Sequence, residues 1–396
     1  MHLHKTLVLR TRLPRQAFDF IHPRFIQIHL DVDIERKIVL KTTLLVKNTS
    51  VDRLSQLWAE RYVPDLSTLS KQAHSLVYSE LVEAASPEGR AKTVAKLQRI
   101  VEINCKCAGI QTSVLFSYIP NIVNLTEGQG IARTAAQVYQ KVLSIYQKQS
   151  LSPALLTTWS RLEAVDVSAD VFTSSALPRL SLWEIQQLAT VIEPLLLQLQ
   201  EQYLISKDQR TIGFMSTQFH LSSKLVLNRL TAPEQLLLSP YFKFIEEQVC
   251  IPWQRVCAAA AKHKLDSPLL AIVQQLLPAS REIALRVYRR AVQLYPNHRS
   301  RRGALSKPEV KASSIRDIEM FQGYLWLCAL EGNMTAVEQE LLPLCIMVFP
   351  SIDVTWELVE QLLPLLVAEI QAYVKPEQMQ LLLPYTQAMQ RLFSKS

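Results

Sequence analysis

Hydrophobic residues follow two different periods along this chain. From Phe25 to Ile34 hydrophobic and polar residues alternate, and a second β-prone run extends from Ile38 to Val46. Alternation places every second side chain on the same face of a strand, so the two runs predict a short β-hairpin. After about residue 52 the hydrophobic residues recur at helical spacing instead. The pattern predicts a mainly α protein in which a β-hairpin precedes a helical body.

Proline, glycine, asparagine and serine residues interrupt the helical pattern and predict where helices begin and end. We expect C-terminal helices near residues 232–263, 267–295, 307–330, 335–348, 353–374 and 376–394. A capping box, in which Ser or Thr precedes Glu by three residues, favours a helix start. This pattern occurs at Ser181–Glu184, Thr231–Glu234, Ser306–Glu309 and Thr335–Glu338.

The length of the chain and the positions of these breaks predict several domains. We expect an N-terminal segment at 1–50 that holds the hairpin, a helical domain of undefined type at 51–175, a helical connector at 176–230 and a compact helical domain at 231–396. The short connections between the last helices favour packing of consecutive helices side by side.

The composition narrows the class of protein. The chain has 8 glycines but 20 prolines, and phosphate-binding loops and tight hairpins both use glycine, so nucleotide-binding α/β folds and all-β folds are disfavoured. The sequence contains no phosphate-binding loop, dinucleotide fingerprint, zinc-protease motif or nucleophile elbow. Six cysteines in 396 residues do not form a disulfide framework. We therefore expect a protein that is not an enzyme and that binds no metal.

Charge and hydropathy bear on partners and location. The formal net charge of +8 is compatible with a solvated basic surface that has no assigned partner, and equally with an acidic partner, a phosphorylated surface or an anionic membrane face. The sequence has no recognised motif for specific nucleic-acid binding. No apolar run reaches the ~20 residues that cross a bilayer. We expect a cytoplasmic protein without a transmembrane segment, and peripheral contact with a membrane stays open.

Candidate chemistry concentrates in residues 314–327. The adjacent residues Arg316 and Asp317 stand next to an apolar stretch that ends at Leu327. A carboxylate beside an apolar wall is costly to dehydrate unless a hydrogen-bond donor reaches it. That donor is either a ligand or the neighbouring guanidinium of Arg316. The sequence leaves both interpretations open.

The order of features around this pair resembles that of the phycobiliproteins, the globin-like helical proteins of the phycobilisome. A long helix ends at Tyr295–Pro296 and a basic loop runs from Asn297 to Gly303. The helix with Arg316 and Asp317 then ends at Leu330–Asn333, and two further helices follow. The resemblance covers about residues 231–396, and it implies a globin-like fold for that part of the chain.

In that family a linear tetrapyrrole, a bilin, lies against the equivalent helix. The resemblance implies that Asp317 accepts hydrogen bonds from the pyrrole N–H groups and that Arg316 pairs with a propionate. It also implies propionate or partner contacts for three basic residues of the preceding loop, Arg299, Arg301 and Arg302. The family's anchoring cysteine corresponds to Ser314, whose hydroxyl cannot form a thioether. Cys328 lies about three to four helical turns further along, too far to replace it. The resemblance therefore predicts no covalent bilin.

Three functions are compatible with the sequence. The first is a non-enzymatic, phycobilisome-related protein that acts through protein–protein contacts in the assembly or regulation of light harvesting. Its partners would be phycobilisome or other light-harvesting proteins, and its location the cytoplasm or the thylakoid surface. The second is an antenna or sensor protein that binds a bilin noncovalently. The third is an unrelated helical regulatory or nucleic-acid-associated protein. Self-association, with residues 176–230 as a candidate contact, is a further expectation.

Overall fold

The computed structural model describes residues 54, 57–59, 61–64, 78–117, 123–163, 177–200 and 211–394. The predicted hairpin within residues 1–50 lies outside these residues. Where the structure describes the chain, its regular elements are helices except for one pair of two-residue strands, so the mainly α prediction is confirmed. None of the helices in these residues is long and apolar enough to cross a membrane.

The first half of the chain contributes seven of the described helices, which precede the predicted C-terminal domain. They are α3 (Tyr78–Ala85), α4 (Pro87–Gln98), α5 (Val101–Leu115), α6 (Leu125–Lys148), α7 (Pro153–Glu163), α8 (Leu182–Gln200) and α9 (Thr211–Leu227).

The second half continues with shorter and longer helices and the small sheet. These elements are α10 (Ala232–Cys250), α11 (Trp253–Ala261), α12 (Pro268–Leu276), α13 (Ser280–Leu294), β1 (Arg299–Ser300), β2 (Gly303–Ala304), α14 (Pro308–Glu331), the π-helical turn η8 (Val337–Leu341), α15 (Leu342–Ser351), α16 (Trp356–Gln371) and α17 (Pro376–Phe393). The strands pair antiparallel, with Arg299 opposite Ala304.

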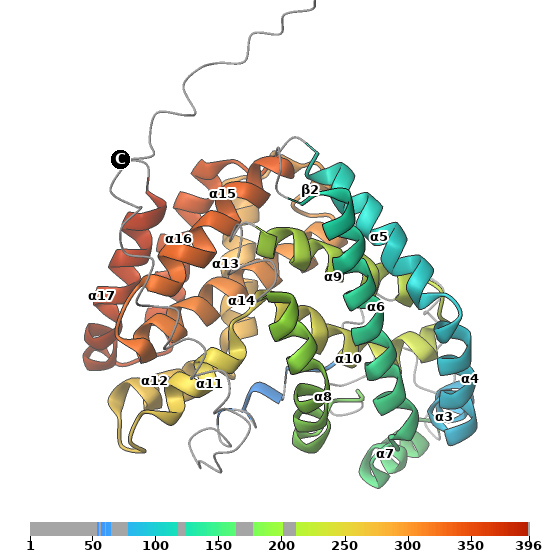
Figure 1. Cartoon of the computed structure of the whole chain (residues 1–396). Helices are drawn as coiled ribbons and strands as arrows, with labels where there is room; N and C mark the ends of the chain where they lie inside the picture. The colour runs from blue at the N-terminus through green and yellow to red at the C-terminus, as the bar shows by residue number, and fades with distance from the viewer. Residues whose placement is uncertain are drawn as a thin grey trace, which may run out of the picture.

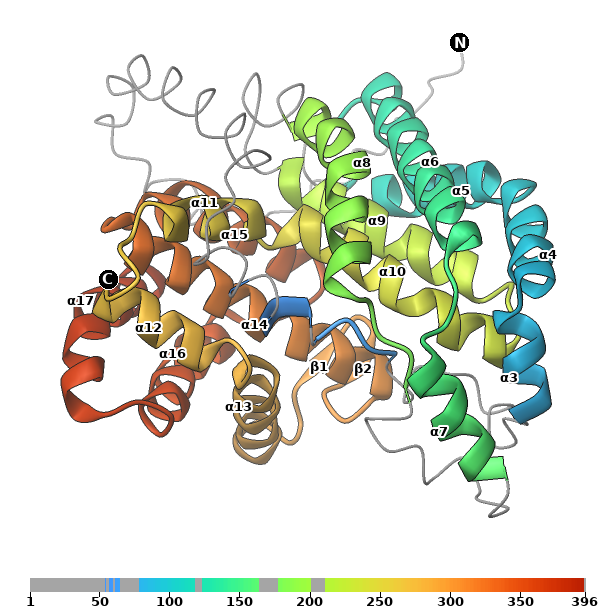
Figure 2. The ribbon, with the colours of Figure 1, turned by 90° about the horizontal axis from the view of Figure 1, so that it is seen from below.

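The helices form a continuous array in which neighbours along the chain are mostly neighbours in space. Figure 1 shows α3–α6 at one end, α15–α17 at the other, and α9, α10 and α14 between them. Figure 2 shows the same order from below. Helix α5 packs against α6 and α9, α9 packs against α10 and α15, and α14 packs against α11, α13 and α17. The two halves therefore meet where α9 packs against α10 and α15.

A single hydrophobic core runs through the described parts of the chain. The ring of Tyr139 on α6 contacts Phe219 on α9, with centroids 6.0 Å apart, and Phe242 on α10, with centroids 4.8 Å apart. These three residues belong to the predicted domain, connector and C-terminal domain respectively. The hydrophobic core is shared across residues 175 and 230. The domain boundaries expected at these two positions stay a prediction.

A short N-terminal segment joins this core through aromatic side chains. Trp58 stacks on Trp253 with ring centroids 4.1 Å apart and meets Trp326 edge-on at 6.1 Å. All three indoles are buried. Aromatic pairs of this kind stabilise beyond the area that they bury, so the segment is fixed to α11 and α14.

Each C-terminal segment that was expected to be helical contains helix, but some of these segments are not single continuous helices. The segments expected at 232–263 and 267–295 are each two helices, because the chain leaves helical geometry at Ile251–Pro252 and at Leu277–Ala279. Proline removes a backbone donor and clashes with the preceding turn, which favours these breaks. Pro240 and Pro364 nevertheless lie inside helices. Tertiary packing therefore decides which prolines end a helix.

Two of the four predicted capping boxes are confirmed. Ser181 accepts a hydrogen bond from the Glu184 amide, and Thr231 with Glu234 forms a complete box at the start of α10. Helix α14 begins instead after Lys307, which has no side-chain cap. The region expected to start at Thr335 is a helical turn that widens to π geometry at Val337. The finer expectation of a globin-like C-terminal domain stays a prediction.

Candidate functional site

Helix α14 carries the pair that the sequence singled out. Pro308 occupies the start of this helix, where a missing backbone donor costs nothing. From Phe321 to Leu330 every residue is buried, whereas Arg316 and Asp317, one turn earlier, keep side chains that are 29% exposed. The guanidinium of Arg316 donates to the Asp317 carboxylate over 3.2 Å. Arg316 is therefore a hydrogen-bond donor for Asp317, and the pair lies at the boundary between core and solvent.

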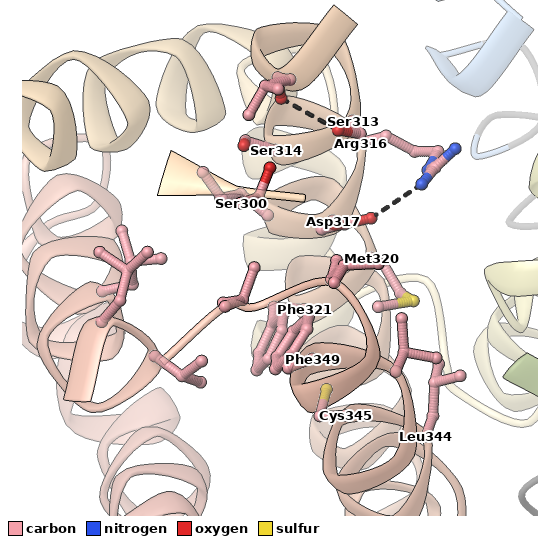
Figure 3. Close-up of a pocket in the computed structure, with 18 of the residues that line it drawn as sticks. Ser300, Ser313, Ser314, Arg316, Asp317, Met320, Phe321, Leu344, Cys345 and Phe349 are labelled. Atoms are coloured by element: carbon pink, nitrogen blue, oxygen red, sulfur yellow. Dashed lines mark hydrogen bonds and ion pairs between the residues drawn. The ribbon is translucent and has the colours of Figure 1, made fainter. Parts of the chain in front are cut away.

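This boundary is the mouth of a cavity of about 160 Å³. Its walls come from α5, α9, α10, α13, α14, α15, α16 and the strand pair, and most of its lining residues are apolar. Figure 3 shows Asp317 and Arg316 near Ser313 and Ser314, with the apolar Phe321 further along α14 and the apolar Phe349 and Leu344 on α15. The cavity thus has an apolar body and a polar mouth.

Five charged or titratable side chains form what we term the cavity-mouth cluster. They are His220 of α9, Glu246 of α10, Arg302 of the strand turn, and Arg316 and Asp317 of α14. The Nδ1 atom of His220 lies 3.1 Å from Glu246 Oε2 and 3.1 Å from an Arg316 amino nitrogen. Its Nε2 atom lies 3.4 Å from an Arg302 amino nitrogen. Side chains from three other elements therefore converge on one imidazole.

These distances favour one tautomer of the neutral histidine. A ring nitrogen that bears a proton donates, and the other accepts. With the proton on Nδ1, His220 donates to the carboxylate of Glu246, and Nε2 accepts from the guanidinium of Arg302. Both nitrogens then have a partner of the right kind. The imidazole links an acidic and a basic side chain without carrying charge itself.

The electrostatics of the cavity-mouth cluster support that protonation state. Burial lowers the pKa of His220, and this outweighs the raising effect of Glu246. Burial raises the pKa of Glu246, but His220 and Arg316 reverse the effect and leave it lowered. Glu246 is therefore ionised and His220 neutral near pH 7. The pKa of the Arg316 guanidinium is raised by Asp317 and Glu246 in spite of its burial.

The three arginines of the basic loop do not all reach the cavity mouth. Arg302 lines the cavity, whereas Arg299 and Arg301 do not. Arg301 pairs with Asp353 at 3.2 Å, and its side chain is 53% exposed. Arg299 is exposed on β1. The structure therefore brings Asp317, Arg316 and Arg302 together and leaves the other two arginines on the outer surface.

The cysteines that line the cavity come from helices other than α14. Ser314 lines the cavity, and Cys328 is buried and not among the lining residues. Cys250 and Cys345 line the cavity, which the sequence did not indicate because both come from other helices. Burial raises the pKa of Cys250 to about 12 and raises that of Cys345 well above its usual value. Both remain thiols, which are poor nucleophiles.

Sequence reasoning missed two members of the cavity-mouth cluster. From the sequence alone, His220 has no carboxylate partner at ligand spacing, and Glu246 and Glu247 fall in a helical surface pattern that predicts solvated charges. The structure contradicts both predictions: His220 contacts Glu246, and Glu247 is 1% exposed. A signal was present, because apolar residues surround the two carboxylates on α10 at Phe244, Ile245 and Val249. Charges within an apolar stretch are paired more often than not.

Glu247 belongs to a second group, which we term the enclosed cluster. One amino nitrogen of Arg61 lies 3.0 Å from Glu247 Oε1 and 2.9 Å from Glu319 Oε2. The three side chains are 7%, 2% and 2% exposed. The guanidinium also lies over the Trp58 ring, 3.9 Å from its centroid. This cluster fastens the N-terminal segment to α10 and α14, and none of its three residues lines the cavity described above.

No protein-family model matches this chain, and comparisons with curated proteins and with solved structures give no significant match. The phycobiliprotein resemblance therefore depends on the residues quoted for it alone. Among the residues that the structure describes, no group of three or more His, Cys, Asp or Glu side chains is placed to hold a metal ion.

Proposed function

We propose that this protein acts by binding, without catalysis, and that its cavity takes a small amphipathic ligand with an apolar body and an anionic group. One observation carries the proposal. Arg302, Arg316 and His220 converge at the mouth of a cavity whose walls are otherwise mostly apolar. Sites of this composition bind ligands by burying an apolar part and orienting it through a few polar contacts.

The mouth offers suitable donors for a carboxylate, sulfonate or phosphate. A guanidinium presents several N–H groups in a plane and binds such anions in a bidentate manner. Arg316 already donates to Asp317, so an incoming anion would compete with Asp317. Protonation of His220 would add a third cation when an anion is present.

The volume limits the apolar part of the ligand. About 160 Å³ is close to the size of engineered protein cavities that hold a single aromatic ring. The enclosed part of the ligand is therefore a ring or a short acyl chain. The rest of a larger molecule would extend through the mouth.

Binding of an aromatic sulfonate tests this proposal. The fluorescence of 1-anilinonaphthalene-8-sulfonate should rise on addition of the protein, and octanoate should reverse the rise. Arg316→Gln should weaken the binding of both ligands by about 10-fold or more, since it removes a charged donor worth about 1.5–3 kcal/mol. Arg299→Gln removes one positive charge outside the cavity and serves as the matched control. Equal affinities for the wild type and Arg316→Gln would contradict the proposal.

A second variant separates the cavity from the surface. Leu362 is half-buried and lines the cavity, so Leu362→Trp should fill it and abolish displacement by octanoate. The circular dichroism spectrum and the denaturation midpoint report whether the variant remains folded. A folded Leu362→Trp protein that binds octanoate normally would exclude the cavity as the site.

A noncovalent bilin is a second candidate ligand, favoured by the position of Asp317. The residue that the resemblance assigns to the pyrrole N–H groups lines the cavity, as do Arg316 and Arg302. A tetrapyrrole would place one ring inside the cavity and the remainder outside. Titration with biliverdin should then give a shifted visible band that Asp317→Asn moves or removes. A spectrum equal to that of free biliverdin would exclude this ligand.

The wider role that the resemblance implies is assembly or regulation of light harvesting through protein contacts. We extend the proposal to this role on the strength of the resemblance alone. Purified phycobilisome subunits should bind the protein, and the triple change of Arg299, Arg301 and Arg302 to Glu should weaken that binding. Absence of binding to any such subunit would exclude the role and leave the ligand site untouched.

A further inference from the structure

Helix α9 lines the cavity along one of its faces. Gly213, Ser216, Thr217 and His220 all belong to the cavity wall, and their spacing places them on the same side of the helix. His220 lies at the mouth, where its ring nitrogens meet the side chains of the cavity-mouth cluster. Ser216 precedes His220 by four residues, so it lies ~6 Å further along the helix axis.

Gly213, one turn beyond Ser216, marks the closed end of this wall. A Cβ atom at Gly213 would collide with Met347 and would lie 2.8 Å from Val348 Cγ2 and 3.0 Å from Leu344 Cδ1. Helices α9 and α15 are therefore in close contact at this level. Gly213 is buried, whereas the side chain of His220 is 25% exposed. Ser216 thus lies between the open mouth and the level at which α9 and α15 meet.

The hydroxyl of Ser216 has no hydrogen-bond partner among the residues that the structure describes. Its Oγ atom is nevertheless withdrawn from solvent. Helical hydroxyls commonly donate to the carbonyl four residues earlier, as those of Thr93 and Thr112 do at 3.1 and 2.8 Å. Ser216 does not make the equivalent bond to Ile212. A buried hydroxyl without a partner is unfavourable, and here it lies in a cavity wall, where a ligand can supply the partner.

We propose that the ligand of this cavity is an aromatic acid with a hydroxyl group para to its anionic group, and that Ser216 binds the hydroxyl. This inference rests on the proposed function and specifies its ligand. With the anionic group at the level of His220, beside Arg302 and Arg316, the second polar group must lie ~6 Å along α9 to reach Ser216. A para-disubstituted benzene ring separates its two substituents by a similar length.

The volume and the lining of the cavity favour a ring between the two polar groups. The volume of about 160 Å³ is close to that of protein cavities that hold one benzene ring. Phe321 and Phe349 both line the cavity, and aromatic rings pack favourably on each other in offset or edge-on arrangements. A rigid ring also loses little conformational entropy on binding, so it can satisfy both ends of the site at once.

Nε2 of His298 is a second polar atom of the cavity wall that lacks a partner in the described part of the protein. His298 directly precedes β1, so it comes from a different wall than α9. Helix geometry fixes the separation between Ser216 and the mouth, and for this reason we assign the ligand hydroxyl to Ser216. Recognition by His298 is the alternative that the experiment has to exclude.

Paired ligands isolate the contribution of the hydroxyl. 4-Hydroxybenzoate and 4-methylbenzoate have nearly the same shape, both are anions near pH 7, and they differ in one hydrogen-bonding group. Isothermal titration calorimetry should show that the wild type binds 4-hydroxybenzoate about 5-fold more tightly. 3-Hydroxybenzoate directs its hydroxyl to another wall and should show no such preference. A meta acid bound as tightly as the para acid would contradict the predicted position of the hydroxyl.

Substitution of Ser216 tests the assignment. Ser216→Ala should abolish the preference for the hydroxylated acid and change the affinity for 4-methylbenzoate by less than about 2-fold. Ser239→Ala is the matched control, because Oγ of Ser239 on α10 is also buried without a partner but does not line the cavity. This control should keep the preference. A preference that survives in Ser216→Ala, or that is lost in His298→Gln instead, would overturn the proposal.

The calorimetry also separates this inference from the proposed function. If both para acids bind the wild type with equal affinity, the cavity remains a ligand site and only recognition of the hydroxyl is wrong. If neither acid binds, the proposed function fails and this inference fails with it. Circular dichroism and the denaturation midpoint establish that each variant is folded.

Discussion

Glu246 and Glu247 are consecutive residues of α10, yet they enter two clusters of different character. Glu246 contacts His220 and Arg316 at the cavity mouth, with 19% of its side chain exposed. Glu247 contacts Arg61 in the enclosed cluster, with 2% exposed. On a helix adjacent side chains point about 100° apart, so one residue step changes the surroundings completely.

We expect the enclosed cluster to affect mainly the stability of the protein and the cavity-mouth cluster to affect mainly ligand binding. In the enclosed cluster Arg61, Glu247 and Glu319 are withdrawn from water, and a charge that loses its partner there has no solvent to replace it. In the cavity-mouth cluster solvent reaches the side chains, so a lost partner is partly replaced by water. Substitutions in the enclosed cluster should therefore alter the free energy of unfolding, and those at the mouth should mainly alter ligand affinity.

The largest expected effect comes from Arg61→Ala. The change leaves Glu247 and Glu319 buried without the guanidinium that contacts both, and removing one partner of a buried pair costs about 3–5 kcal/mol. Urea denaturation gives the free energy of unfolding. Arg299→Ala, at an exposed position, should change it by no more than about 0.5 kcal/mol. A loss below about 1 kcal/mol for Arg61→Ala would show that the enclosed cluster does not hold the N-terminal segment.

A smaller effect distinguishes the adjacent carboxylates directly. Glu247→Gln should lower the free energy of unfolding by about 2 kcal/mol, since it removes a buried partner of Arg61. Glu246→Gln keeps the size of the side chain and faces partial solvent, so its cost should stay below about 1 kcal/mol. Both variants are compared by urea denaturation under the same conditions. Equal costs would contradict the division between an enclosed and a solvent-facing cluster.

The smallest effect is a pH dependence that arises from His220. Its pKa is lowered in the folded protein, whereas the unfolded value is about 6.5. Between the two values the unfolded chain binds more protons, so His220 stabilises fully above pH ~6.5 and loses that contribution as the pH falls towards the folded pKa. Free energies of unfolding from pH 5 to pH 8, about the range in which histidine titrates, check the prediction.

The His220→Gln variant isolates this contribution from other groups. Burial raises the pKa of Glu193 to about 7, so its contribution changes in the opposite direction over much of the same range. Burial also lowers the pKa of His298. The difference between wild type and His220→Gln removes both. A difference that does not change with pH would mean that His220 titrates in the folded protein as it does in the unfolded chain.

The local sequence determines which segments of this protein form helices. Hydrophobic periodicity predicts the C-terminal helices, because a buried stripe recurs every three to four residues whatever lies opposite it. The capping boxes at Ser181 and Thr231 are also local, since each involves two residues within one turn. The pairing of Arg316 with Asp317 falls in the same class.

Only the tertiary structure decided what those elements contact. His220, Glu246 and Arg316 lie 26 and 70 residues apart in succession along the chain and meet because α9, α10 and α14 cross at one place. The breaks at Pro252 and Pro278 and the continuous helices at Pro240 and Pro364 have the same cause. Packing between distant segments overrides local helix propensities, which differ by less than about 1 kcal/mol for most residues and by about 3 kcal/mol for proline. That packing is not encoded in any single stretch of sequence.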